Sequence, residues 1–144
     1  MPATDWRTAV TAPEHDERNR EFVRALYVAS FAGDADAFPK AMASDFVADV
    51  SPQLPWGGVH RDPDEFVNVV LPQLASAIDF SSMRLVSISA DGDRAAALLN
   101  ARTTRGADFW LAEHWVIQAG KLQRLRVFCF DTRSLAARPA PAVS

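Results

Sequence analysis

The residues that could do chemistry lie together in one predicted strand near the end of the chain. Between Leu111 and Ile117 the side chains alternate between two faces, so Glu113 lies on one face and His114 on the other. Each has apolar neighbours on its own face. A carboxyl group or an imidazole in apolar surroundings can exchange protons near neutral pH. The face that lines a cavity therefore decides which chemistry is available.

The pattern leaves two interpretations open for each of these residues. If Glu113 is buried among its apolar neighbours, loss of hydration raises its pKa, and the residue can act as a general acid or base. If it points outward, it forms a cross-strand pair with Arg124 or Arg126, which contributes little to stability. His114 is either a catalytic group or a histidine on a structural or dimer face.

Four further residues have a chemical and a structural interpretation. Asp131 ends the last strand, where it either forms a hydrogen bond that stops the strand or lies at a cavity mouth. Asp49 alternates with apolar residues and so faces away from their side, unless the strand bends. Trp56 lies in a loop rich in proline and glycine, as a lid or as a hydrophobic plug. Cys129 is either a reactive cysteine or a buried packing thiol, and the packing thiol is expected.

Composition limits the classes of function. A chain of 144 residues is long enough for one domain, and a net charge of −3 without a cluster of basic residues argues against a nucleic-acid partner. No apolar run is long enough to span a membrane, and no signal peptide is recognisable, so a cytoplasmic location is expected. Ligand spacing for a metal and a glycine-rich phosphate loop are both missing, so we expect no cofactor.

The hydrophobic periodicity predicts helices first and strands afterwards. Gly33 ends a first helix over residues 17–32, a short helix follows to about residue 42, and residues 46–50 form a strand. Asp62 and Pro63 begin a third helix that continues to about residue 78. Four antiparallel strands complete the chain: residues 83–90, residues 94–104 and the two strands of the hairpin that turns at residues 119–121.

This order predicts an α+β fold in which three N-terminal helices pack on a strongly curved antiparallel or mixed sheet. Such a sheet forms a cone whose open end is a natural pocket. Residues 15–135 are predicted to form this domain. Residues 1–14 are expected to be flexible, and the Ala/Pro-rich tail over residues 136–144 is expected to be disordered.

Several local motifs match a known group of proteins. They are Phe31-Ala32-Gly33-Asp34, Leu54-Pro55-Trp56-Gly57-Gly58, Gly120-Lys121-Leu122 and Phe130-Asp131-Thr132. In this order they resemble the nuclear transport factor 2-like superfamily, most closely its SnoaL-like (polyketide cyclase-like) branch, over residues 17–135. The resemblance implies a cystatin-like α+β barrel with a cone-shaped pocket. It does not imply one reaction, since members include isomerases, dehydratases, cyclases, epoxide hydrolases and proteins that only bind a ligand.

Two specific reactions are disfavoured by the resemblance itself. Of the three ketosteroid isomerase positions, only the strand acid matches, at Glu113; the tyrosine position falls on Leu26 and the base position near Val50, each one residue from a suitable side chain. The limonene-type epoxide hydrolases use an Arg-x-Asp pair, which this chain lacks. Val127 or Phe128 also occupies the place of their last aspartate. The count from Lys121 to Asp131 is one residue longer than in the relatives, so the resemblance also implies a bulge in this last hairpin.

The resemblance to SnoaL-like cyclases implies cofactor-independent acid/base chemistry on a hydrophobic, carbonyl-bearing molecule: cyclisation, isomerisation or dehydration, as in an isomerase or lyase. Counting from Gly120-Lys121 places the inward position of these relatives on Glu113, which His114 or Asp131 would assist. The predicted substrate-binding residues are Tyr27, Phe46, Asp49, Trp56, Phe109 and Trp115. The alternative is a non-catalytic binding or interaction module. In either case we expect a homodimer through the apolar sheet face around His114.

Overall fold

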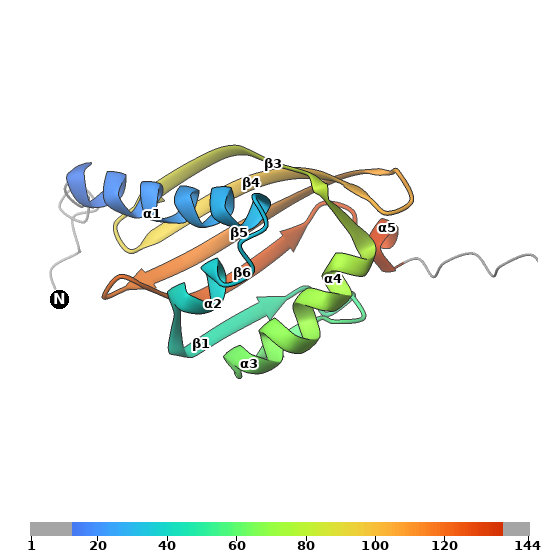
Figure 1. The fold of residues 1–144 in the computed structure, drawn as a ribbon, viewed down its shortest axis with the longest axis horizontal. Helices are drawn as coiled ribbons and strands as arrows, with labels where there is room; N and C mark the ends of the chain where they lie inside the picture. Colours follow the sequence, from blue (N-terminus) through green and yellow to red (C-terminus); the bar gives the residue numbers. More distant parts are fainter. Residues whose placement is uncertain (1–12, 137–144) are drawn as a thin grey trace, which may run out of the picture.

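The computed structural model describes residues 13–136, so most of the predicted flexible N-terminus and Ala/Pro-rich tail lies outside the described residues. One sheet forms the centre of the molecule, and the helices α1, α2 and α4 lie on one of its faces (Figure 1). The predicted α+β fold, with N-terminal helices packed on a curved mixed sheet, is confirmed. None of the helices within residues 13–136 is long and apolar enough to cross a membrane.

The sheet has six strands in the order β2-β1-β6-β5-β4-β3 and is not closed. Its strands are β1 (Met42–Val50), β2 (Gly58–His60), β3 (Ile78–Asp91), β4 (Arg94–Thr103), β5 (Asp108–Gln118) and β6 (Lys121–Cys129). The pair β1–β6 is parallel, and all other neighbouring strands are antiparallel. The predicted meander is therefore β3 to β6, and β1 and β2 extend it beyond β6.

The helix ends follow the sequence signals. Helix α1 (Pro13–Phe31) is ended by Gly33, whose φ of +96° suits glycine, and the N–H groups of Gly33 and Asp34 donate to carbonyls of the last turn. Helix α2 (Ala37–Ala41) follows. Asp62 caps the next helix by accepting a hydrogen bond from the N–H of Asp64, with Pro63 in the first turn.

The third predicted helix is one continuous helical segment with a change of winding. It comprises α3 (Pro63–Glu65), the π-helical turn η1 (Phe66–Val70) and α4 (Leu71–Ala77). Pro72 lacks an N–H group, and its ring crowds the carbonyl four residues earlier in an α-helix. A wider turn immediately before this proline is the expected response.

Four features differ from the sequence-based expectation. Strand β1 begins at Met42, and β3 begins directly at Ile78, where a register shift between Asp79 and Arg84 interrupts the alternation that marks a strand. Strand β2 has three residues, and α5 (Arg133–Ala136) has four, both too short to give a periodic pattern.

The predicted bulge in the last hairpin is confirmed at Gln123, between the partners of Val116 and Ile117.

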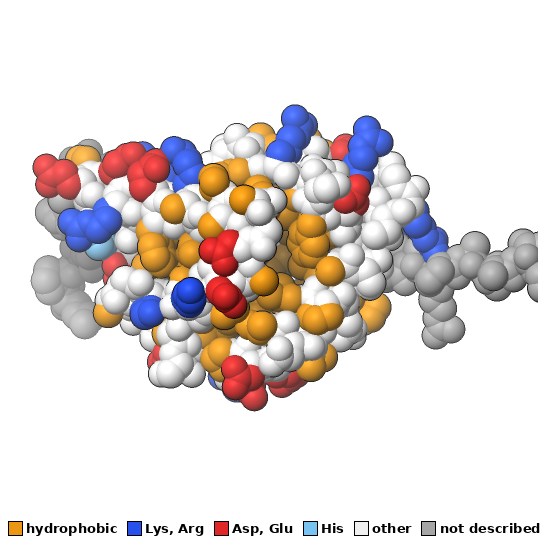
Figure 2. Space-filling view, in the orientation of Figure 1, with side chains coloured by type: hydrophobic (Ala, Val, Ile, Leu, Met, Phe, Trp, Pro, Cys, Tyr) orange, Lys and Arg blue, Asp and Glu red, His pale blue; other side chains and the backbone are white. Residues whose placement is uncertain are grey.

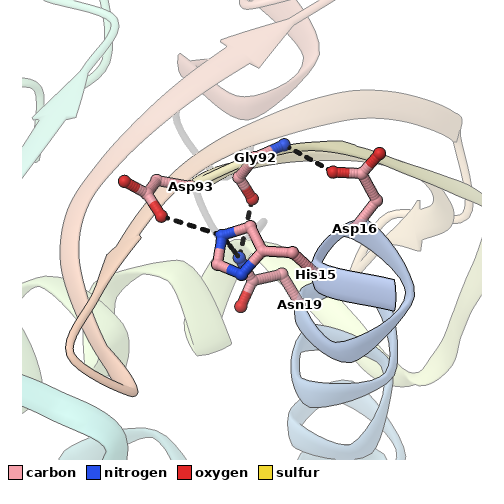
Figure 3. A network of polar contacts seen from close by, with 5 residues as sticks. All are labelled: His15, Asp16, Asn19, Gly92 and Asp93. Atoms are coloured by element: carbon pink, nitrogen blue, oxygen red, sulfur yellow. Dashed lines mark hydrogen bonds and ion pairs between the residues drawn. The ribbon is translucent and has the colours of Figure 1, made fainter. Parts of the chain in front are cut away.

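Polar contacts fasten the first turns of α1 to the β3–β4 turn (Figure 3). The amide of Asn19, which is 6% exposed, donates to the carbonyl of Gly92 at 2.7 Å. The N–H of Gly92 in turn donates to Asp16 Oδ1 at 2.7 Å, and His15 Nε2 lies 3.1 Å from Asp93 Oδ1. These contacts fix the position of α1 over the sheet, and Tyr27 follows Asn19 on the same helix about 12 Å further along the axis.

We predict that Asn19→Ala lowers the free energy of unfolding by about 1–2 kcal/mol, because the buried carbonyl of Gly92 loses its donor. Urea unfolding monitored by circular dichroism measures the change. Arg18→Ala, at an exposed position of the same turn, is the control and should change stability by less than about 0.5 kcal/mol. Equal effects of the two substitutions would contradict the role given to Asn19.

Candidate functional site

Glu113 lies on the concave face of the sheet, beneath the helices. Across the sheet it pairs with Ala97 on β4 and with Val127 on β6. Its neighbours on the same face of β5, Leu111 and Trp115, are buried. The outward alternative, a pair with Arg126, does not form, because Arg126 lies on the opposite face and binds Asp49.

A chain of hydrogen bonds joins Glu113 to helix α1. The indole N–H of Trp115 donates to Tyr27 Oη at 2.9 Å, and the Tyr27 hydroxyl donates to Glu113 Oε1 at 2.9 Å. Phe38 of α2 stacks on the Trp115 ring and packs against Tyr27 in a T-shaped arrangement. The alternation of β5 and the helical spacing of Val23 and Tyr27 thus bring a phenol and a carboxyl group together on the inner side of both elements.

The environment of Glu113 favours its neutral form. Burial raises its pKa to about 7, and the hydrogen bond from Tyr27 limits the rise by stabilising the carboxylate. Among residues 13–136, no cation pairs with this carboxyl group. Burial and the nearby charge of Glu113 raise the pKa of Tyr27 well above its usual range, so its phenol stays protonated. Near neutral pH, Glu113 can therefore both accept and give a proton.

Part of this site remains accessible from outside the core. Glu113, Val127 and Cys129 are only partly buried, although most of the concave face around them is fully buried. Figure 2 shows a recess with hydrophobic walls on this side of the molecule, between the α1–α2 turn and helix α4. Burial is the main cause, and the charge of Glu113 the second, that raises the pKa of the Cys129 thiol to about 11. Cys129 is therefore a neutral wall residue and no thiolate nucleophile at neutral pH.

Two other hollows lie away from Glu113. One, of about 430 Å³, lies between the end of α4 and the β4–β5 turn, where Asp79 and Arg102 are among its lining residues. The second, of about 410 Å³, lies between the start of β1 and the β5–β6 turn. Glu113 lines neither of them. Its own surroundings combine a titratable group with apolar walls, the combination that binding sites for small organic molecules share.

The remaining predicted aromatic residues belong to the core. Phe46 and Phe109 are fully buried on the concave face. Trp56 is 7% exposed and packs in the core cluster, so in this structure it fills space as a plug. His60 holds its loop, with Nε2 2.8 Å from the Trp56 carbonyl oxygen and Nδ1 3.4 Å from Glu65 Oε1.

The structure does not bring His114, Asp49 or Asp131 to Glu113. His114 is on the convex face, where burial and the charges of Arg94 and Arg126 lower its pKa. Asp49 lies on the same face, 3.2 Å from Arg126 Nε. Asp131 follows β6 and accepts a hydrogen bond from the Arg133 N–H, which starts the turn of α5. The assisting roles of His114 and Asp131 remain predictions without a contact to Glu113.

Comparison with known proteins identifies the family. The sequence profile described as the SnoaL-like domain matches residues 23–125, more than half of the chain. The chain belongs to the SnoaL-like domain family. This confirms the resemblance inferred from the motifs. The curated proteins contain no match to this sequence.

Solved structures similar to this SnoaL-like domain share its fold. An NTF2-like protein from Burkholderia thailandensis is 25% identical, with a TM-score of 0.68 over 81% of this chain and 93% of that one. A protein from Jannaschia sp. CCS1, assigned as a SnoaL-like polyketide cyclase, is 12% identical, with a TM-score of 0.70 over 90% and 98%. TerC, co-crystallised with polyporic acid, is 20% identical, with a TM-score of 0.64 over 79% and 92%.

Sequence reasoning missed two walls of the site in this SnoaL-like domain. Val127 and Cys129 lie two residues apart on β6 and share its concave face, with Val127 opposite Glu113 and Cys129 opposite Leu111. The register of the hairpin could have indicated both positions once the bulge at Gln123 was placed. Tyr27 was expected to contact the substrate, but its hydroxyl is occupied by Glu113 and Trp115. Within residues 13–136, no group of three or more His, Cys, Asp or Glu side chains is arranged to hold a metal ion.

The raised pKa of Glu113 predicts a pH dependence of stability. Between about pH 4.5 and 7 the folded protein keeps a proton that the unfolded chain has lost, so the free energy of unfolding falls as the pH rises through this window. Glu113→Gln keeps an acceptor for Tyr27 and cannot ionise. From pH 5 to pH 8 its stability relative to the wild type should increase by about 2 kcal/mol, less than the full shift because the carboxyl is partly accessible.

Urea unfolding at both pH values measures this difference. The matched control is Glu21→Gln on the exposed side of α1, whose stability relative to the wild type should stay constant over the same range. If the Glu113→Gln curve runs parallel to the wild-type curve, Glu113 is not a buried, neutral acid.

Proposed function

We propose that this protein binds a hydrophobic, carbonyl-bearing small molecule and carries out cofactor-independent acid/base chemistry on it, with Glu113 as the proton-transfer group. The observation that carries the proposal is a partly accessible carboxyl group with a pKa of about 7, held by the Tyr27 hydroxyl among apolar walls. A group with this pKa is near the optimum for general acid/base catalysis at neutral pH. The similarity to a protein assigned as a polyketide cyclase and to TerC, crystallised with polyporic acid, supports this substrate class.

The chemistry needs only one titratable group. Ionised Glu113 removes a proton from the carbon next to a carbonyl, and the electron pair of the C–H bond moves into the enolate. The neutral acid then returns the proton to another carbon in an isomerisation, or to a departing hydroxyl group in a dehydration. In a cyclisation the enolate carbon attacks a second carbonyl of the same molecule, whose oxygen takes the proton.

The charge distribution favours an uncharged ligand. Glu113 has no cationic partner on the concave face of the described sheet, and the arginines near β5 and β6 lie on the other face. A carboxylate or phosphate on the ligand would be repelled by ionised Glu113 without a compensating contact. The partly exposed Val127 and Cys129 offer apolar contact instead.

The second candidate function is a binding module without turnover. It is favoured by the limited access to Glu113 and by the position of His114 and Asp131 away from it, which leaves one acid/base group where many enzymes use two. A cytoplasmic location fits both candidates, because the single cysteine cannot form an internal disulfide.

Proton exchange in deuterated buffer separates the two functions. A panel of polycyclic ketones and hydroxyquinones is incubated with the protein, and mass spectrometry follows exchange of the C–H protons next to the carbonyl. We predict exchange catalysed by the wild type and reduced about 100-fold or more in Glu113→Gln, with Glu21→Gln as the unchanged control. Binding without catalysed exchange would establish the binding module and refute the enzyme. His114→Gln in the same assay tests the assisting role of His114.

We further propose that the convex sheet face forms a homodimer interface. Leu98, Ala112 and Phe128 lie in one row across β4, β5 and β6, and Leu98 and Phe128 are 37% and 54% exposed. Exposed apolar groups in a row on a sheet face are typical of an interaction surface. A second copy can cover this row with its own, as a two-fold axis requires.

We predict that the wild type is a dimer by light scattering after gel filtration, and that Phe128→Glu is a monomer because the introduced charge would be buried without a partner. Val28→Glu is the control, since Val28 is an exposed apolar residue of α1, away from the sheet. A monomeric wild type, or a dimer that Phe128→Glu leaves intact, would rule out this interface.

A further inference from the structure

The hydrogen bonds around Tyr27 can run in only one direction. An indole N–H is a donor only, so Tyr27 Oη must accept the bond from Trp115. The single hydroxyl proton of Tyr27 is then directed to Glu113 Oε1, 2.9 Å away. The ring packs against Phe31, Phe38 and Trp115, and only 2% of the residue's surface is exposed, so Tyr27 Oη is held between the Trp115 indole and Glu113.

We propose that Tyr27, itself held by Trp115, is a positioning residue that occupies Oε1 of Glu113 and leaves Oε2 as the one oxygen that exchanges a proton with a ligand. The proposal rests on the proposed function of Glu113 as the acid/base group. It adds which atom reacts, from which side the ligand approaches, and what sets the proton affinity of the carboxyl group.

The neutral form of Glu113 follows the same constraint. In a carboxylic acid the carbonyl oxygen is the better acceptor and the hydroxyl oxygen carries the proton. The bond from Tyr27 therefore makes Oε1 the carbonyl oxygen and places the acid proton on Oε2. Because α1 covers the Oε1 side, a ligand reaches Oε2 from the side of β6, where Val127 and Cys129 keep accessible surface.

The contact from Tyr27 also sets the pH range in which the site works. The donated hydrogen bond stabilises the carboxylate and opposes the effect of burial. Without it, Glu113 would hold its proton to higher pH and would be a weaker acid in its neutral form. Tyr27 does not exchange a proton itself, because both hydrogen-bonding roles of its hydroxyl are filled and its pKa lies well above the neutral range.

The titration of Glu113 by carboxyl ¹³C NMR tests the proposal without any substrate. The Glu113 signal is assigned by its loss in Glu113→Gln. Tyr27→Phe removes only the hydroxyl and should raise the apparent pKa of Glu113 by about one pH unit, since hydrogen bonds to charged groups are among the strong ones. Phe31→Leu, which alters a ring packed on Tyr27 and no hydrogen bond, is the matched control and should leave the titration in place.

A second measurement works in the opposite direction and keeps the fold intact. Tyr27 is the only tyrosine in the sequence, so growth with 3-fluorotyrosine replaces this residue alone. The more acidic fluorophenol is a stronger donor and should lower the apparent pKa of Glu113. An unchanged Glu113 titration in fluorotyrosine protein, or equal shifts in Tyr27→Phe and Phe31→Leu, would overturn the positioning role.

The same variants distinguish this inference from the proposed function. If the Glu113 titration shifts as expected and the wild type catalyses proton exchange, the pH profile of that exchange should shift in Tyr27→Phe by the same amount. If the titration shifts while no exchange is catalysed, the positioning role stands and the enzymatic function fails. If exchange occurs with a pH profile that Tyr27→Phe does not move, the positioning role fails and the function of Glu113 stands.

Discussion

The hydrogen bond between Tyr27 and Glu113 is the contact on which the rest of the site depends. A carboxyl group beneath the helices loses water, and only a fixed donor can compensate for part of that loss. The donor comes from α1, which is distant in the sequence, so the position of α1 along the sheet must be fixed. The turn at Gly33 and the contacts of Asn19 with the β3–β4 turn fix that position. The fold thus positions one hydroxyl group against one carboxyl group.

The balance between burial and this donor gives Glu113 its chemical character. Burial alone would raise the pKa of this acid further, and several donors would keep it ionised. One donor and a partly accessible surface leave a pKa of about 7, at which both forms are present. Cys129 shows the contrast: burial and the charge of Glu113 both raise the pKa of its thiol, to about 11. Glu113 is therefore the group of this site that titrates near neutral pH.

Periodicity in the sequence was sufficient to predict on which face of its helix or strand a residue lies. It was insufficient to predict which residues of different elements come into contact. Alternation along β5 placed Glu113 and Trp115 on one face, and helical spacing placed Tyr27 on the inner side of α1. Their contact depends on how a helix and a strand separated by more than 80 residues pack, which no local pattern encodes. The choice between lid and plug for Trp56 also needed the packed structure, because a loop of turn residues has no period. Strand β2, with three residues, is shorter than any periodic signal.

The register of β5 decides which of two neighbouring titratable residues is the acid/base candidate. Side chains alternate with a period of two, so a slip of one residue would exchange Glu113 for His114 beneath the helices. That slip would also bring Leu111, Trp115 and Ile117 to the convex face, where charged groups such as Arg94 and Arg126 lie. Burial of these three apolar side chains stabilises the observed register by several kcal/mol. The identity of the buried titratable group thus follows from its apolar neighbours. His114 is excluded from the concave face by the same burial that places Glu113 there.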